Sequence, residues 1–159
     1  METSPGSTQR LLVAAAALGL PPIELHHFPE GTKTAQDAAV AIGCSVAMIV
    51  KSLVFVVDDH PVLALVPGDL RLDTNKLASV AGGQRATRAP LDLVREATGY
   101  VAGGTPPFGH ARSLPIFADQ KLARHGELWA AGGTPSTVFQ ISHNDLLNVT
   151  GATVCDITE

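Results

Sequence analysis

One lysine, Lys51, interrupts the apolar run that extends from Ile49 to Val57. An ammonium group held against apolar walls loses solvation, which lowers its pKa and lets it act as an acid or a base near neutrality. If it stays charged, it can hold a carboxylate, a phosphate or a polarised carbonyl group. The same side chain can form a Schiff base, or simply extend from a strand end to water. Lys51 is therefore a candidate catalytic residue whose chemistry the run alone leaves open.

A second candidate is the loop Tyr100-Val-Ala-Gly-Gly-Thr-Pro-Pro-Phe-Gly-His110, with three glycines and two prolines. Glycine can take positive φ or let a ligand approach the main chain closely. Each proline fixes its own φ and restricts the residue before it. The loop is thus stiff, and at Gly103 and Gly104 it can offer backbone N–H groups to a carbonyl oxygen or a ribose hydroxyl. A structural turn between two elements remains the alternative.

Other kinds of chemistry lack their sequence signatures. The patterns GxxxxGK[ST], GxGxxG and GxSxG are absent, which argues against a phosphate loop, a dinucleotide fingerprint and a nucleophile elbow. No Ser/His/Asp set stands out. Cys44 and Cys155 have no ligand-like spacing, and the adjacent His26 and His27 do not form an HExxH-type motif. We expect neither a metal nor a cofactor.

Composition limits the functional classes. The net charge is −4 and the pI is about 5.8, which argues against sequence-independent nucleic-acid binding but leaves room for a protein that grips one end of an RNA. Hydrophobic residues make up 45% and aromatic residues 4%, so we expect a core of Ala, Val and Leu. No apolar run reaches the roughly 18 residues that a membrane span needs. We expect a cytoplasmic protein with no membrane partner.

Residues 1–159 are expected to form one domain of the α/β class (α+β type), a mixed sheet with surrounding helices after a loose start at residues 1–6. Capping residues and glycine stops predict helices over residues 9–18, 34–43, 73–80, 91–98 and 144–149. Turn signals and apolar runs predict strands over residues 23–28, 49–57, 62–66, 85–88, 114–118, 127–131, 137–141 and 153–157. Residues 58–61 are expected to turn a hairpin, and residues 119–122 a further turn. Hairpins interleaved with helices indicate a mixed sheet.

The candidates form a pattern that resembles the YbaK family, relatives of the editing domain inserted in bacterial prolyl-tRNA synthetases. The resemblance extends over residues 9–157, and the pairing of Lys51 with the glycine loop is its most specific part. The matching segments are Asp37-Ala-Ala, Ile42-Gly43, Lys51-Ser-Leu-Val-Phe55, Gly103-Gly-Thr-Pro-Pro107-Phe-Gly109, Ala131-Gly-Gly133, Ser142-His-Asn-Asp145 and Val154-Cys-Asp156-Ile157.

The resemblance implies a YbaK-like fold and hydrolysis of the ester between a wrong amino acid and the 3′ end of tRNA, usually tRNA(Pro). By this likeness Lys51 and Gly104 are catalytic, and a hydroxyl of the terminal adenosine or a bound water is the attacking group. The implied partners are aminoacyl-tRNA, through its 3′ end and acceptor stem, and prolyl-tRNA synthetase, but not DNA. The residues implied to bind the aminoacyl ester and terminal ribose are Gly103, Thr105, Pro106, Pro107, Phe108 and Gly109.

We expect further walls of this site from Phe28, Thr32 and Ser52, together with Phe108. Ser52 follows Lys51 in a strand, so it faces the other way unless the strand is bulged, and its alternative role is that of a sheet-face hydroxyl. His110 can meet a tRNA phosphate or solvent. Candidates for acceptor-stem contacts, with scattered surface charge as the alternative, are Arg85, Arg88, Arg112 and Lys121.

The sequence departs from the family at two positions. Cysteine-specific members have a serine and an aspartate where this chain has Ala131 and Val138. The histidine of the synthetase-inserted domain has no counterpart in that strand, because His143 belongs to the start of the final helix. These differences argue against cysteine and leave alanine, serine and threonine open. Synthetases discriminate poorly among small side chains, one methylene being worth only about 1–3 kcal/mol.

Three functions remain in competition. The first is a deacylase acting in trans, since no synthetase or anticodon module accompanies the domain in this sequence. The second is a non-catalytic module of the same fold that recruits tRNA or a synthetase, and the third is a hydrolase for another small ester. The presence of both Lys51 and Gly104 favours the enzyme over the binding module.

Overall fold

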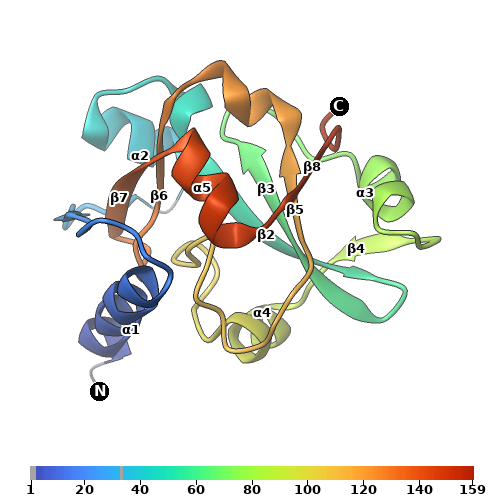
Figure 1. Cartoon of the computed structure of the whole chain (residues 1–159), viewed down its shortest axis with the longest axis horizontal. Coiled ribbons are helices and arrows are strands. Elements are labelled where there is room, and N and C mark those ends of the chain that lie inside the picture. The colour runs from blue at the N-terminus through green and yellow to red at the C-terminus, as the bar shows by residue number, and fades with distance from the viewer. Residues whose placement is uncertain (1–2, 33) are drawn as a thin grey trace.

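The computed structural model describes residues 3–32 and 34–159, and within them eight strands are surrounded by five α-helices and two 3-10 helices (Figure 1). The strands are β1 (Leu25–His27), β2 (Val50–Val57), β3 (His60–Pro67), β4 (Ala86–Arg88), β5 (Ile116–Asp119), β6 (Glu127–Ala131), β7 (Thr137–Ser142) and β8 (Thr153–Cys155). The helices are α1 (Thr3–Ala17), α2 (Ala35–Ile42), α3 (Thr74–Val80), α4 (Leu91–Thr98) and α5 (His143–Thr150), with 3-10 helices η1 (Val46–Met48) and η2 (Gln120–Arg124).

The strands divide between two sheets. The larger has the order β4-β2-β3-β5-β8, and the smaller the order β1-β7-β6. In the larger sheet β2 pairs antiparallel with β3 and β4, while β3–β5 and β5–β8 are parallel. The mixed α/β fold is thereby confirmed, but with two sheets in place of one. They remain separate because, among the described residues, the pairing between them is limited to an isolated parallel bridge from Ile49, just before β2, to Trp129 of β6.

The hairpin of β2 and β3 carries the apolar run around Lys51. Its turn is shorter than residues 58–61, because Asp58 and Asp59 both have positive φ, 47° and 73°, and β3 starts directly at His60. Positive φ at both central residues gives a tight hairpin turn whose twist matches that of the strands. Proline is tolerated at Pro61 and Pro67, which lie opposite Val56 and Val50, because these are positions whose N–H would point away from β2.

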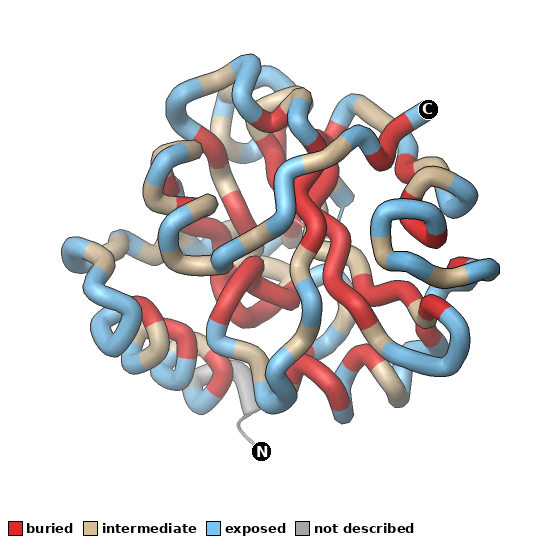
Figure 2. The backbone as a smooth tube through the Cα atoms, turned by 45° about the vertical axis from the view of Figure 1, so that its right-hand side comes forward, coloured by how far each residue is buried: buried red, intermediate tan, exposed pale blue. Residues whose placement is uncertain are grey.

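The larger sheet is covered on both faces (Figure 2). On one face α3 packs Leu77 onto Phe55 and Phe117, with Ile157 of the C-terminal segment alongside. On the other face Val50 and Val54 of β2 belong to a second cluster, whose members come from α1, α4, α5 and the smaller sheet. Successive residues of β2 therefore point into different cores, as the period of two demands.

Helix ends follow the capping signals in the sequence. Thr34, Asp73 and Ser142 accept backbone N–H groups at the starts of α2, α3 and α5, and Gly43 and Gly99 end their helices in the left-handed conformation. His143 is the first residue of α5, as expected. None of the described helices is long and apolar enough to cross a membrane.

Several boundaries differ from the expectation. Helix α1 already begins at Thr3, so residues 3–6 are not loose, and residues 1 and 2 lie outside the described residues. A proline at position 5 fits a first helical turn, whose N–H groups have no partner within the helix. Residues 120–124 form η2 in place of a turn, because Asp119 caps it by accepting the Lys121 N–H. Strand β8 stops at Cys155, since the Ile157 N–H turns to Asp119 Oδ1.

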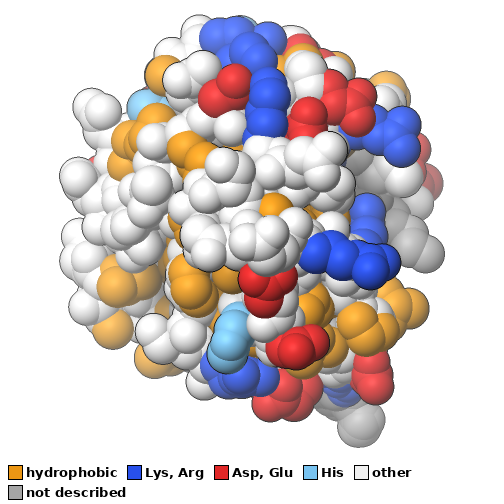
Figure 3. Space-filling model, turned by 90° about the vertical axis from the view of Figure 1, so that its right-hand side faces the viewer, with side chains coloured by type: hydrophobic (Ala, Val, Ile, Leu, Met, Phe, Trp, Pro, Cys, Tyr) orange, Lys and Arg blue, Asp and Glu red, His pale blue; other side chains and the backbone are white. Residues whose placement is uncertain are grey.

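Surface charges alternate in sign on the face that carries α3 and β4 (Figure 3). Lys76 Nζ lies 3.1 Å from Asp156 Oδ2, and Arg71 Nε lies 3.7 Å from Glu159 Oε2. Pairs of this exposed kind contribute little to stability. Lys76 and Arg71 on this face are thus each paired with a neighbouring anion.

Candidate functional site

A cavity of about 500 Å³ lies where the first half of β2 faces the glycine loop and the end of β6. Its size is within the range of pockets that bury a small ligand. Five of the residues expected to be catalytic or to bind the aminoacyl end line it, namely Thr32, Lys51, Ser52, Gly103 and Thr105. Residues that are far apart in the chain are thus brought to one place by β2, the loop after α4, and the turn that precedes α2.

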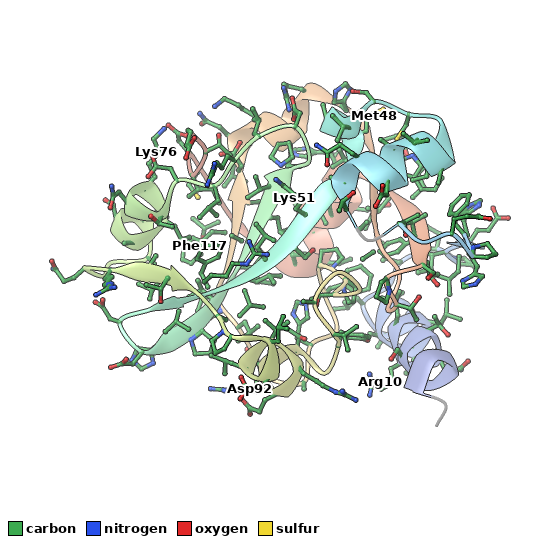
Figure 4. All side chains as sticks on the ribbon, turned by 180° about the vertical axis from the view of Figure 1, so that it is seen from behind. Arg10, Met48, Lys51, Lys76, Asp92 and Phe117 are labelled. Carbon is green, nitrogen blue, oxygen red and sulfur yellow. The ribbon has the colours of Figure 1, made fainter. Side chains whose placement is uncertain are left out.

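Lys51 reaches the cavity from β2, where the strand passes beside α2 (Figure 4). Its Nζ donates to the carbonyl oxygen of Leu70 at 2.7 Å. Burial lowers the pKa of Lys51; Arg88 and Arg71 lower it further, while Asp69 acts in the opposite direction. The side chain is therefore neither a free surface lysine nor part of an ion pair. Its ammonium group keeps hydrogen-bonding capacity for a ligand beside a fixed carbonyl.

The carbonyl that holds Lys51 is itself held in place. Asp69 accepts from both terminal nitrogens of Arg124, at 2.9 and 3.2 Å. This hydrogen bond is the main reason that the pKa of Asp69 is lowered. The adjacent Gly68 has no room for a side chain, because a Cβ atom there would lie 2.5 Å from the Val46 carbonyl oxygen. The segment from Gly68 to Leu70 is thereby fixed between η1 and η2.

Ser52 lies on the opposite face of β2 from Lys51, and the strand between them has no bulge. Its hydroxyl oxygen is buried and finds no hydrogen-bond partner among the described residues. A buried polar group without a partner costs about 1–3 kcal/mol, so it calls for an explanation. Lys51 and Ser52 line the same cavity from two faces of one strand, which means that the cavity is open along the edge of β2.

The glycine loop is shaped by contact with the turn after β6. The Gly104 N–H donates to Val101 O at 3.0 Å, and Gly104 O accepts from Gly133 N at 3.1 Å. A Cβ atom on Gly104 would lie 2.8 Å from main-chain atoms of Thr134. Gly104 does not line the cavity, and both of its backbone polar groups are used within the fold. It contributes the close approach of two loops and not a free donor.

The neighbouring residues Gly103 and Thr105 do line the cavity. Gly103 is exposed and has a φ of 86°, which a residue with a side chain adopts only with strain. Thr105 is buried, and its hydroxyl donates to Val101 O at 3.0 Å. Of the three consecutive residues, Gly103 and Thr105 thus line the cavity, while Gly104 fixes the loop.

The remaining loop candidates belong to the interior. Phe108 is only 2% exposed, and its ring packs edge-to-face on Phe139, 5.8 Å away, so it is a core residue and not a cavity wall. Pro106, Pro107 and Gly109 also lie outside the lining residues. The apolar ring of Phe108 and the low exposure of both prolines give the loop its rigid base.

Two other candidate residues, Phe28 and His110, do not line the cavity. Phe28 also lies outside the lining residues; its N–H donates to Ser136 O. The imidazole Nε2 of His110 donates to Pro106 O at 2.8 Å. Burial lowers the pKa of His110, and the bond to Pro106 partly offsets this. His110 therefore closes the loop on itself instead of extending to solvent.

The opposite wall of the cavity comes from the smaller sheet. Ala131 and Val138 are register partners in β6 and β7, and both line the cavity. Trp129 also lines it, packed edge-to-face against His26 with ring centres 5.3 Å apart. This wall is apolar. Trp129 was missed from the sequence, although as the only tryptophan of the chain, close to Ala131, it carried a signal.

Of the basic residues considered for long-range contacts, Arg88 lines the cavity. Arg112 pairs with Glu96 at 2.8 Å, and Lys121 Nζ donates to the Thr158 hydroxyl at 3.1 Å. Over residues 3–32 and 34–159, no group of three His, Cys, Asp or Glu side chains is placed to hold a metal ion. The described side chains that line the cavity therefore offer two cations, Lys51 and Arg88, together with serine and threonine hydroxyls and one glutamine amide.

Comparison with known proteins gives one family. The family described as "Aminoacyl-tRNA editing domain" matches residues 29–149. A protein of Enterococcus faecalis named "Putative Cys-tRNA(Pro)/Cys-tRNA(Cys) deacylase EbsC" is 26% identical over 126 residues, 79% of this chain and 77% of that protein. A proline–tRNA ligase of Nitratidesulfovibrio vulgaris is 36% identical over 109 residues, 69% of this chain but only 18% of the ligase.

A solved structure is similar over nearly the full length. The "Crystal structure of a putative trans-editing enzyme for prolyl tRNA synthetase" superposes with a TM-score of 0.90 at 42% sequence identity. The superposition covers 96% of this chain and 97% of that one. The relatives therefore include both separate small proteins and a segment of a much larger ligase.

Proposed function

The chain belongs to the aminoacyl-tRNA editing domain family, and from this membership we propose that it is an aminoacyl-tRNA deacylase that acts in trans. The reaction is hydrolysis of the ester between a mischarged small amino acid and the terminal ribose of a tRNA, with tRNA(Pro) as the expected carrier. We propose that residues 1–159 act as one domain in the cytoplasm. The similarity in length and shape to the trans-editing structure supports this arrangement.

The observation that carries the proposal is the cavity itself. It joins Lys51, held by Leu70 O, to Gly103 of the glycine loop, and it is walled by apolar residues of β6 and β7. An ammonium group in such a desolvated site interacts strongly with developing negative charge. Lys51 would stabilise the oxyanion that forms when the ester carbonyl is attacked, or hold the adjacent phosphate.

The attacking group would come from outside the protein side chains. Among the described lining residues there is no carboxylate and no imidazole that could activate a serine. A water molecule, oriented by the free hydroxyl of the terminal adenosine, would attack the carbonyl carbon. The bond to the ribose oxygen would break, and that oxygen would take up the proton that the water releases. The role of the protein is then orientation and charge stabilisation.

The apolar wall bears on the substrate side chain. The side chains of Ala131 and Val138 offer no hydrogen-bonding group to a thiol or hydroxyl, whereas Ser52, among the described lining residues, has a buried hydroxyl without a partner. This supports alanine, serine or threonine as the amino acid removed. Because the relative EbsC is named as a putative Cys-tRNA deacylase, the experiment must also include tRNA charged with cysteine. Arg88, which also lines the cavity, would supply a second cation for the phosphates at the 3′ end of the tRNA.

The test is deacylation of tRNA(Pro) charged in turn with Ala, Ser, Thr, Cys and Pro, with the wild type beside Lys51→Ala. We expect one mischarged species to be hydrolysed in a Lys51-dependent way while Pro-tRNA(Pro) is spared. Full activity in a folded Lys51→Ala protein would refute the role of the lysine. If none of the five is hydrolysed, a binding module of the same fold becomes the better explanation, and direct tRNA binding should then be measured.

A further inference from the structure

We propose that the aminoacyl group docks on the main chain of Ser52, at a gap one residue long in the edge of β2. Its α-ammonium would donate to the Ser52 carbonyl oxygen, and its ester carbonyl would accept from the Ser52 N–H. The inference rests on the proposed function and adds the way in which that substrate is held.

The direction of the Ser52 main chain follows from the register of the hairpin. In an antiparallel pair, residues alternate between those that exchange hydrogen bonds and those that do not. Gly68 N donates to Ile49 O at 2.8 Å, so Ile49, and every second residue after it, bonds to β3. Ser52 is out of phase with that series and lies opposite Leu65. Its N–H and C=O therefore point away from β3, toward the other edge of β2.

That edge is occupied on both sides of Ser52 but not at Ser52. Beyond it, Ala89 N donates to Val54 O at 3.1 Å, and β4 then pairs with Phe55 to Val57. Before it, the strand is bridged to Trp129 of β6. Within the described part of the chain, no residue of β4 or β6 is paired with Ser52. The gap opens on the cavity, which Ser52 lines.

The chemistry of the gap matches one end of the substrate. Unpaired main-chain groups at a strand edge bind an extended peptide by completing the sheet. An aminoacyl ester presents an ammonium donor and a carbonyl acceptor on either side of one α-carbon, as a peptide residue does. It can therefore fill the gap with two hydrogen bonds. One of these is charge-assisted, and such bonds are about twice as strong as neutral ones.

The docking also places the substrate side chain. In a hydrogen-bonded antiparallel pair the two side chains lie on the same face of the sheet. The side chain of an L-amino acid would thus lie beside that of Ser52, on the face of Val50 and Val54 and toward Val138. This is where the buried hydroxyl of Ser52 has no partner. Main-chain docking would recognise any L-aminoacyl group, while this neighbourhood selects the side chain.

The direct test is NMR with the amide-linked analogue 3′-deoxy-3′-(L-alanylamino)adenosine, which is not hydrolysed. We expect the Ser52 amide proton to move downfield and its hydrogen exchange to slow at least about tenfold on saturation. The Leu53 amide, already bonded to β3, is the internal control and should change little. The propionyl analogue, which lacks the α-amino group, should bind about 10- to 100-fold more weakly.

A matched pair of variants gives a second readout. Ser52→Ala keeps the amide and removes only the hydroxyl, whereas Ser52→Pro removes the N–H as well. Because the register turns this N–H away from β3, and no described residue of β4 or β6 pairs with Ser52, proline is tolerable there by the rule for edge positions. We expect kcat/KM of Ser52→Pro to fall at least about tenfold below that of Ser52→Ala, with thermal unfolding confirming that both are folded.

The outcomes separate the two proposals. If the analogue shifts other cavity amides but leaves Ser52 unchanged, the docking inference is wrong. If the protein deacylates tRNA yet the analogue does not bind, the inference is likewise wrong while the proposed function stands. Absence of both deacylation and binding would overturn the two together.

Discussion

The two halves of β2 have the same backbone and opposite uses. The second half, Val54–Val57, is paired with β3 on one side and β4 on the other, and Val54, Phe55 and Val57 are at most 5% exposed. In the first half, Ser52 is paired with β3 on one side and with no described strand on the other. This half also carries Lys51 and Ser52, which line the cavity. Where both edges of β2 are paired, the strand belongs to the core. Where one edge is unpaired, the strand lines the candidate site.

The two halves of β2 also differ in how they affect the stability of the folded state. Paired edges and apolar faces lower the free energy of the folded state, whereas a desolvated ammonium and an unpaired hydroxyl raise it. Both of the unfavourable groups lie in the first half of β2 and none is found in the second half. The Ser52 hydroxyl has no partner among the described residues, and Lys51 Nζ keeps hydrogen-bonding capacity beyond its bond to Leu70 O, so both groups are available to a ligand.

The largest expected effect is on activity in the first half. Replacing Lys51 by methionine keeps the length of the side chain and removes its charge, so we expect kcat/KM for deacylation to fall about 100- to 1000-fold. Thermal unfolding should be unchanged or slightly higher, because a desolvated charge has been removed. Deacylation of the species identified in the tRNA panel, measured beside a melting curve, checks both statements.

The matched control for this variant is Lys76→Met. Lys76 on α3 also donates to a main-chain carbonyl at 2.7 Å, that of Thr158, but it does not line the cavity (Figure 4). We expect its activity to stay within about twofold of the wild type, as for most surface substitutions. Equal losses in the two variants would show that the effect is not specific to the open half of β2.

The second prediction concerns stability in the covered half. Phe55 is 5% exposed in the cluster under α3, so Phe55→Ala should lower the free energy of unfolding by about 3–5 kcal/mol. The folded fraction should keep its kcat/KM. In contrast, Ser52→Ala removes a buried hydroxyl without a partner and should leave the unfolding free energy unchanged or raise it. Urea denaturation of both variants makes the comparison, and a larger loss in Ser52→Ala would reverse our assignment of the two halves.

The smallest effect is the pH dependence of the lysine. The pKa of Lys51 lies below its ordinary value of 10.5, chiefly because of burial. If the ammonium form stabilises the oxyanion, the Lys51-dependent rate is full below the lowered pKa and declines as the pH rises through it. We expect the ratio of the wild-type rate to the Lys51→Met rate to have fallen by more than half at pH 10.5. Taking this ratio cancels base-catalysed hydrolysis. A ratio that rises with pH would instead identify Lys51 as a base.

Much of the fold could be predicted because its signals are local. Thr34, Ser142, Gly43 and Gly99 mark helix ends by hydrogen bonds and dihedral angles within a few residues. The alternating faces of β2 follow from the period of a strand. The division into two sheets could not be predicted in this way, because it depends on how β2 and β6 meet, and these strands are distant in sequence and joined by an isolated bridge between Ile49 and Trp129.

The site was predicted in part for the same reason. Lys51, Ser52, Thr32, Gly103 and Thr105 were found by residue type and pattern, and the structure brings them to one cavity. Phe108 was expected in the wall of the site but lies in the core. An aromatic residue in a glycine loop can point to a ligand or to the core, and here its ring packs on Phe139, which is distant in sequence. The carbonyl of Leu70 belongs to the main chain and has no signature in the sequence.

By itself, the sequence determined which segments form helices and strands, and that one lysine lies alone in an apolar strand. It also determined the rigidity of the glycine loop and the family resemblance. Each of these follows from residue type and short-range spacing. The tertiary structure alone decided that Gly104 supplies close packing and no free donor, that Lys51 is held by Leu70, and that β4 ends before Ser52. These facts depend on which distant segments meet in the fold. Whether a donor or acceptor group is paired is decided by the group that the fold places opposite it.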